Sequence, residues 1–192
     1  MADSTITKKA IAESLKKIMK DKPFEKISVA EICEDCGLTR KSFYYHFKDK
    51  YDLVSWIFDY DFLGKRDRII GYDMVSFFDD LFKYLYENRS FYRKLFQSDG
   101  QNSFHDTFVQ GIAPIADGIC ASVLPNVPPA LAKCYVDFFC EGLTAAVKHW
   151  LDSGLSDKDF IDATHQAVNE TVTFIIGCQM EFSQFLDMGK EE

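Results

Sequence analysis

The chain has 192 residues, 47% of them hydrophobic and 27% charged, a balance that excludes wholesale disorder and fits one or two globular domains. It contains no run of 18 apolar residues and no basic-then-apolar leader, so we expect a cytoplasmic protein that does not enter a membrane. Residues 1–50 hold 11 Lys and Arg against 8 Asp and Glu, whereas residues 51–192 hold 11 against 22. This division predicts a basic domain over 1–50, suited to a polyanion, and an acidic domain over 51–192.

The first predicted elements are two helices joined by a proline break. Apolar residues recur at helical spacing over 5–20, and Pro23 stops the pattern. Ser28, with Glu31 three residues later, has the spacing of a capping box, which predicts a short second helix to about Asp35.

A turn and two further helices follow. Gly37 allows the positive φ that a tight turn needs, and Thr39 is the expected N-cap of a third helix from Arg40 to about His46. Two short helices joined by a turn of about three residues form the helix-turn-helix arrangement. A fourth helix is expected from about Asp49 to Gly64, where the aromatic content of the chain rises.

The rest of the chain predicts five more helices, because Pro and Gly mark breaks between its helically periodic stretches. Their expected bounds are 73–88, 90–97, 103–124, 129–152 and 157–187. No stretch alternates with the period of two that marks a strand. The predicted fold is therefore all-α with about nine helices: an N-terminal three-helix helix-turn-helix DNA-binding domain and a larger helical regulatory and dimerisation domain.

Six cysteines leave several interpretations open. Cys33 and Cys36 form a C-x-x-C pair, which is typical of half a zinc site or of a redox pair. A zinc site needs a second pair at matching spacing, and a redox pair should follow a strand; the sequence shows neither. We favour reduced thiols that pack as small apolar side chains, and we expect no metal and no cofactor.

The helix-turn-helix segment divides into an inward and an outward face. Its inward residues are spaced to pack onto the first helix and are Val29, Ile32, Leu38, Phe43 and Phe47. Cations and hydroxylated aromatics gather on the outward side, as base and phosphate recognition in DNA requires. The predicted DNA-contacting residues are Ser28, Thr39, Arg40, Lys41, Tyr44, Tyr45, His46 and Lys50. The alternative is a solvated basic face on an ordinary helical bundle.

Residues 5–55 resemble the DNA-binding domain of the TetR/AcrR family of bacterial transcriptional regulators. The most specific part is LTRKSFYYHFKDKYDL, residues 38–53. The resemblance implies that the predicted contact residues touch an operator. Lys41 departs from the family pattern, since a glycine is commonest there, and it supplies an additional cation for a phosphate or base contact. The segments 56–62 and 88–92 are similar to the subgroup that regulates dihydroxyacetone-kinase operons, some members of which are thought to respond to a partner protein.

In this family, effectors generally occupy a cavity in the C-terminal domain. Aromatic side chains at helical spacing are the candidates for its lining, although such residues more often form core: Phe58, Phe62, Phe78, Phe82, Tyr86, Phe104, Phe108, Phe138, Phe139 and Trp150. Polar residues able to orient a ligand are Asn102, His105, Glu141 and His149. We expect the fourth helix to act as the lever between the domains, with Trp56, Phe58 and Phe62 reaching into the acidic domain.

The last two predicted helices are the family's dimerisation element, so a homodimer through about residues 130–187 is expected. The alternative is that the same apolar stripe packs within its own chain. No nucleophile, metal or nucleotide motif of an enzyme is present. The sequence therefore predicts a regulator bound to double-stranded DNA and modulated by a small molecule or a partner protein. Two alternatives are an activator with no small-molecule pocket, controlled by a partner protein, and an all-α adaptor that does not bind DNA.

Overall fold

The structure, a computed structural model, describes residues 2–64, 74–98, 103–153, 156, 158–164, 166–167 and 170. These residues are all-α, as predicted, and none of them lies in a strand. The elements are α1 (Ala2–Ile18), the 3-10 helix η1 (Phe24–Lys26), α2 (Val29–Asp35), α3 (Arg40–His46), α4 (Lys50–Asp61), α5 (Met74–Glu87), α6 (Arg89–Phe96), α7 (Phe104–Val123) and α8 (Pro129–Asp152). Helical residues at 158–164, 166–167 and 170 follow α8, so the described part agrees with the expected number of about nine helices.

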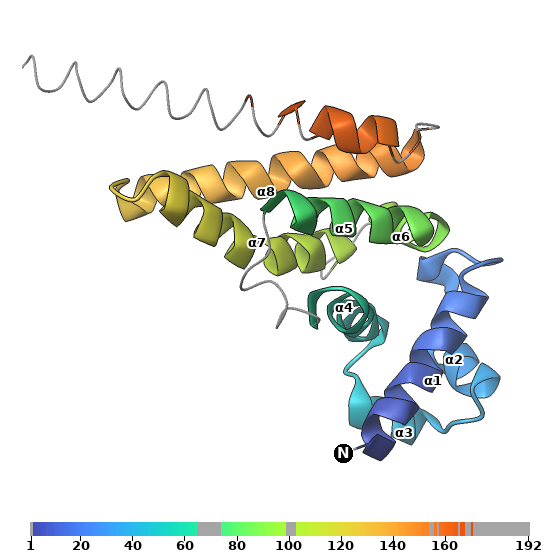
Figure 1. Ribbon diagram of the computed structural model, residues 1–192. Coiled ribbons are helices and arrows are strands. Elements are labelled where there is room, and N and C mark those ends of the chain that lie inside the picture. Colours follow the sequence, from blue (N-terminus) through green and yellow to red (C-terminus); the bar gives the residue numbers. More distant parts are fainter. Residues whose placement is uncertain are drawn as a thin grey trace, which may run out of the picture.

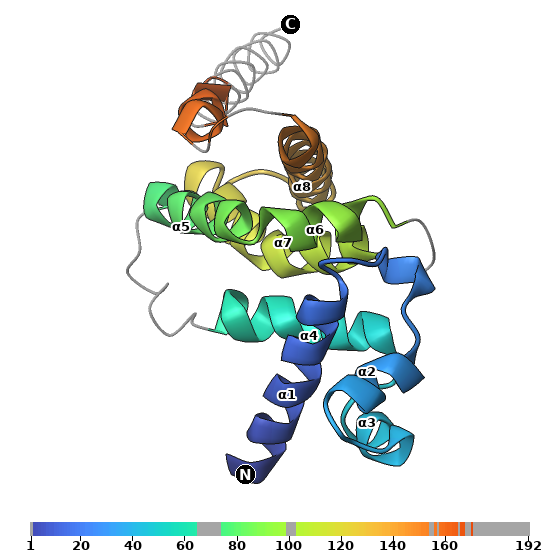
Figure 2. The same ribbon diagram turned by 90° about the vertical axis from the view of Figure 1, so that its right-hand side faces the viewer.

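The helices lie in tiers (Figures 1 and 2). Helices α1, α2 and α3 form one end of the molecule, which we call the head. Helix α4 lies between the head and the group formed by α5, α6 and α7, and α8 lies on the far side of that group. We call α5–α8 the body. Helix α1 runs from the outer end of the head toward α6, so the head meets the body through α1 and α4.

The predicted helix bounds hold to within a few residues through Asp152. The first helix begins at Ala2 and ends at Ile18, earlier at both ends than the predicted 5–20. The predicted break at Pro23 is confirmed, since it precedes η1. The ninth predicted helix, 157–187, lies mostly outside the described residues, and its residues beyond 170 lie entirely outside them.

The expectation that Pro and Gly fall only between helices is wrong for α7. Pro114 lies inside this 20-residue helix, where it removes one backbone hydrogen-bond donor, but its side chain is exposed and the helix continues to Val123. Gly111 also lies inside α7. A Cβ atom there would come within 2.7 Å of the Leu63 side chain and 3.2 Å of the Phe58 ring. The glycine therefore allows α7 to approach the end of α4 closely.

Aromatic rings form the centre of the body. The fully buried ring of Phe58, on α4, contacts five other rings, one directly after α4 and the others on α5, α6 and α7: Phe62, Tyr84, Tyr92, Phe104 and Phe108. Close-packed rings of this size contribute much of the apolar burial that stabilises a helical domain. Because Phe58 belongs to α4, this cluster fixes α4 firmly to the body.

Candidate nucleic-acid interface

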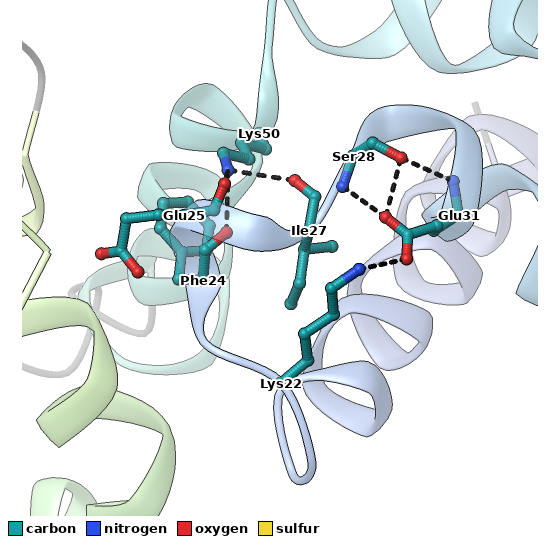
Figure 3. Close-up of polar contacts among 7 residues, drawn as sticks. All are labelled: Lys22, Phe24, Glu25, Ile27, Ser28, Glu31 and Lys50. Atoms are coloured by element: carbon teal, nitrogen blue, oxygen red, sulfur yellow. Dashed lines mark hydrogen bonds and ion pairs between the residues drawn. The ribbon is translucent and has the colours of Figure 1, made fainter.

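The second helix of the head, α2, has a capped start, and Figure 3 shows the cap. The Ser28 hydroxyl accepts a hydrogen bond from the Glu31 backbone N–H, and the Glu31 carboxylate accepts one from the Ser28 backbone N–H at 2.9 Å. The predicted capping box is thus confirmed. Lys22 also pairs with the Glu31 carboxylate. The hydrogen bond from Lys22, followed by those from Ser28, lowers the pKa of Glu31 from 4.5 to about 2.

The turn between α2 and α3 depends on a glycine and a small side chain. Gly37 has φ of 68°, as predicted, in a region that side-chain-bearing residues seldom adopt. The Leu38 N–H donates to the Cys33 carbonyl at 2.9 Å and closes the turn. Cys33 is buried there as a free thiol, and the Cys36 thiol contacts the Cys33 carbonyl at 3.6 Å. Burial raises the pKa of both thiols, which disfavours thiolate chemistry.

Helix α3 has one buried face and one open face. Thr39 caps it as predicted, accepting a hydrogen bond from the Ser42 N–H at 3.1 Å. The Phe43 ring is fully buried and touches Phe47, which is also buried. On the open side, 83% of Tyr45 is exposed to solvent. A helix held from behind by its apolar residues thus displays a large aromatic side chain outward.

Seven of the eight predicted DNA-contacting residues lie at the start of α2 or along α3 and its N-cap. Ser28, Thr39, Arg40, Lys41, Tyr44 and Tyr45 are exposed, and His46 is half-buried with its ring edge against Tyr45. The hydroxyls of Ser28 and Thr39 also cap their helices, which leaves them in fixed positions. The head thus presents cations, hydroxyls and aromatic rings over residues 39–46, and a further hydroxyl, that of Ser28, at the start of α2.

Lys50 does not join this group. Its ammonium donates to the carbonyls of Phe24, Glu25 and Ile27 at 2.8, 3.0 and 3.0 Å and lies 4.5 Å from the centre of the Phe24 ring (Figure 3). These three bonds account for all three N–H donors of a lysine. Burial lowers the pKa of this ammonium. We therefore replace the predicted phosphate contact of Lys50 with a structural role: it ties the start of α4 to the segment that leads into α2.

The polar contacts that join the head to α4 and to the body were not predicted from the sequence. Lys94 on α6 donates to the carbonyls of Met19 and Lys20, just after α1, at 2.5 and 2.8 Å. Lys16 on α1 pairs with Asp61 on α4 at 2.9 Å. An excess of lysines near a helix end was visible in the sequence, but the partner carbonyls come from tertiary structure.

Asp61 also connects to the interior of the body. The hydroxyls of Tyr84 and Tyr92 are hydrogen-bonded to each other, and Tyr92 is fully buried. Burial raises the pKa of Tyr84 most strongly, and the nearby Asp61 carboxylate raises it further. A chain of polar groups therefore extends from the aromatic cluster through Asp61 to Lys16 on α1.

Helix α4 has one face toward the head and the opposite face toward the body. The Tyr51 ring meets Phe24 edge-on at 5.1 Å, and the Trp56 ring meets Phe47 at 5.8 Å, both in the head. Phe58 and Phe62 face the body. The expectation that Trp56 reaches into the acidic domain is therefore wrong, because Trp56 lies two residues, or about 200° of helix, away from Phe58.

The predicted lining residues of the body lie in three environments. Those packed inside are Phe58, Phe78, Phe82, Phe104, Phe108 and Trp150. Phe62 and Phe139 are half-buried against this core, and Tyr86, partly exposed, stacks on Trp150. Phe138 is 73% exposed, so its predicted place in a cavity is wrong. It lies about 200° around α8 from the buried residues Val136 and Cys140 and faces away from the interior.

The polar candidates of the body lie at its surface. His105 and Glu141 are joined by a hydrogen bond of 2.9 Å between α7 and α8, and both side chains have substantial exposure. His149 is exposed, and Asn102 lies outside the described residues. None of the three described side chains points into the aromatic cluster.

Two family models match the chain. Residues 11–56 match the model of bacterial regulatory proteins of the tetR family, and residues 73–169 match that of a transcriptional regulator C-terminal region. The second model alone spans half of the chain. The protein belongs to the TetR family of transcriptional regulators. The resemblance seen in the sequence is thus confirmed, and both matched models describe regulators, not enzymes.

Individual relatives agree with this assignment. The HTH-type dhaKLM operon transcriptional activator DhaS of Lactococcus lactis subsp. lactis (strain IL1403) is 35% identical over 111 residues, which span 57% of this chain and 59% of that protein. The structure of a dihydroxyacetone kinase operon activator DhaS has a TM-score of 0.61 at 22% identity, covering 93% of this chain and 98% of that one. A TetR regulator of Streptococcus agalactiae 2603V has a TM-score of 0.63 at 16% identity, covering 84% and 93%. At these identities the two structures show a shared fold.

The capping carboxylate predicts a specific dependence of stability on pH. Because the folded-state pKa of Glu31 is lowered to about 2, its stabilisation is complete above about pH 5 and is lost as the pH falls toward 2. Glu31→Gln keeps the capping geometry but cannot ionise. We expect urea unfolding, followed by circular dichroism between pH 6 and 3, to show a smaller loss of stability in Glu31→Gln than in the wild type. Parallel losses in the two proteins would contradict this role.

The ties of Lys50 predict a structural phenotype. Lys50→Met leaves three carbonyls without their charged donor, so we expect the free energy of unfolding to fall by roughly 1–3 kcal/mol. The salt dependence of DNA binding should stay the same, because no phosphate contact is lost. Lys48→Met, at an exposed lysine two residues earlier, should leave stability unchanged. If Lys50→Met is as stable as the wild type and the slope of log affinity against log salt falls by about one, Lys50 binds a phosphate after all and its structural role is wrong.

Proposed function

We propose that the protein is a dimeric regulator that inserts α3 into the major groove of an operator and whose body controls the positions of the two heads. The observation that carries this proposal is the open face of α3. Two tyrosines, one of them 83% exposed, stand beside two cations on a helix that is packed firmly from behind. Exposed rings of this size on a folded surface are typical of a binding site.

The charge distribution supports DNA as the ligand of the head. A basic head attracts the phosphate backbone, whereas the acidic body is repelled by it, so DNA approaches from the head side. The alternative, a helical adaptor that does not bind DNA, leaves the exposed Tyr44 and Tyr45 without a partner. Because bacterial DNA lies in the cytoplasm, we expect the protein to act there. Among the described residues, no helix is both long and apolar enough to span a membrane.

The exposed face of α8 supports a homodimer. Leu131 and Phe138 are large apolar side chains with high exposure, and the small residues Gly142, Ala145 and Ala146 continue the same exposed stretch. Large rings next to small residues allow two helices to pack closely. A second copy of α8 is the natural partner for this face, since a two-fold dimer presents two heads to a near-palindromic site. The predicted range 130–187 extends beyond the described residues.

A signal from the body would reach the head through α4 and α6. Phe58 and Phe62 fix one face of α4 in the aromatic cluster, while Tyr51 and Trp56 fix the opposite face to the head. Lys94 adds a second route from α6 to the end of α1. These contacts support the prediction that α4 couples the two parts of the molecule, with Trp56 on the side of the head and not of the body. A small molecule or a partner protein remains the proposed effector, and the name of the Lactococcus relative favours activation of an operon.

Removing the cations of α3 tests the proposed function. We expect the wild type to select specific fragments from its own genomic DNA and to bind them at nanomolar concentration in fluorescence anisotropy. The double variant Arg40→Ala/Lys41→Ala should bind at least a hundredfold more weakly, because two charge-assisted contacts are lost. The control Lys83→Ala/Arg93→Ala removes two exposed cations from α5 and α6, outside the predicted dimer range, and should bind like the wild type. Equal binding by both double variants, or no selection by the wild type, would refute the proposal.

A charge on α8 tests the dimer. Phe138→Asp should give a monomer in sedimentation velocity at micromolar concentration, because a carboxylate cannot be buried unpaired between two α8 helices. Phe138→Leu keeps an apolar side chain and should remain dimeric. Since Phe138 is exposed in the single chain, both variants should keep the wild-type helical content. A wild-type monomer at this concentration, or a dimeric Phe138→Asp, would exclude this interface.

A further inference from the structure

The residues on the open face of α3 do not all point in the same direction. The buried ring of Phe43 fixes the inward direction of the helix. Successive residues of an α-helix are turned by about 100°, so Lys41 and Tyr45 lie at about 160° and 200° from Phe43. They are therefore the two residues most nearly opposite the buried ring. Four residues apart, they are neighbours on one ridge of the helix, and both are exposed.

Two other predicted contact residues, Arg40 and Tyr44, lie together on one flank of this ridge. Arg40 is turned by about 60° from Phe43, toward α2, where its charge acts on the Cys33 thiol. Tyr44 is turned by about 100° and its ring edge rests against Phe43 at 5.5 Å. These two side chains stand beside the ridge on one side of α3, the side that would face one wall of a groove.

Lys41 is also free to bind. No acidic side chain among the residues that the structure describes forms an ion pair with Lys41. It occupies the first turn of α3, directly after Arg40. In helix-turn-helix proteins, the N-terminal residues of the recognition helix contact the base edges.

From this geometry we propose that Lys41 and Tyr45 read bases, with Lys41 selecting a guanine in each half-site, whereas Arg40 and Tyr44 hold phosphates. This assignment rests on the proposed function and adds the basis of its specificity. A lysine ammonium donates to the N7 and O6 acceptors of guanine in the major groove. The Tyr45 ring offers an apolar surface to a neighbouring thymine methyl group. Phosphate contacts from this flank orient the helix without reading sequence.

Selection from a randomised duplex library tests the assignment. We expect the full-length wild type to enrich a near-palindromic site. Each half-site should contain one position at which guanine is preferred because of Lys41. Lys41→Met should lose the preference at that position alone and bind the wild-type site about tenfold to a hundredfold more weakly. Lys41→Arg should restore the guanine, because arginine donates to the same acceptors. Tyr45→Ala should relax an adjacent position, whereas Tyr45→Phe should keep it.

Arg40→Met is the matched control, since it removes a cation from the adjacent residue. It should weaken binding to all sequences alike and lower the slope of log affinity against log salt by about one. All of these side chains are exposed, and thermal unfolding should confirm that each variant keeps its fold.

Two outcomes would overturn the assignment in different ways. If Lys41→Met keeps every base preference, binds all DNA more weakly and lowers the salt slope by one, Lys41 is a phosphate ligand. The regulator would then stand while this inference fails. If the wild type enriches no sequence at all, the proposed function itself fails. If Arg40→Met changes the preferred bases, the division between ridge and flank is wrong.

Discussion

The arrangement of the head depends on the burial of one ring, that of Phe43. Helix α3 has seven residues, far fewer than an isolated helix needs for stability in water. Its hydrogen bonds persist because Phe43 is enclosed by the head and because Thr39 satisfies a free N–H at its start. The inward ring therefore determines where the outward side chains point. A recognition surface on so short a helix is only as well ordered as the core behind it.

Helix α1 packs against α2 and α3 and connects the head to the rest of the molecule. The buried Ser14 hydroxyl donates to the Ile32 carbonyl at 3.0 Å, which joins α1 to α2. At its other end, α1 meets α4 through the pair of Lys16 and Asp61, and it meets α6 through the carbonyls that Lys94 binds. Lysines at the C-terminal end of a helix interact favourably with its dipole, and here one of them comes from a different domain. These polar contacts add to the apolar packing of α4 against the head and together fix the position of the head.

Features of the fold that depend on residues close together in the sequence could be predicted, and those that depend on distant residues could not. The capping box of Ser28, the turn at Gly37 and the cap at Thr39 arise from residues within five positions of one another, so their spacing alone indicates them. Helix bounds were close to the observed ones for the same reason. Phe43 was also predictable, because the period of 3.6 residues places it on the buried face.

The wrong or revised predictions involve partners that are distant in the sequence. Lys50 has the appearance of a free cation until the fold brings the carbonyls of residues 24–27 around it. The sequence shows that Trp56 and Phe138 are apolar, but the helix phase and the neighbouring helices decide which side they face. Gly111 resembles a helix breaker, yet it serves the contact between α4 and α7. Periodicity identifies a buried face and says little about what covers it.

The packing of the body limits how a signal can act. Five rings surround Phe58, and close-packed interiors respond to an inserted group by shifting whole elements instead of deforming gradually. A small molecule among these rings would have to displace α4, α5 or α7, and Gly111 leaves little room between α4 and α7. A partner protein on the surface would reach the head through the same two connections, α4 with Asp61 and α6 with Lys94. An effector of either kind therefore shifts the equilibrium between two arrangements of the heads only if it binds more tightly to the protein in one of them, with its own position of α4 or α6, than in the other.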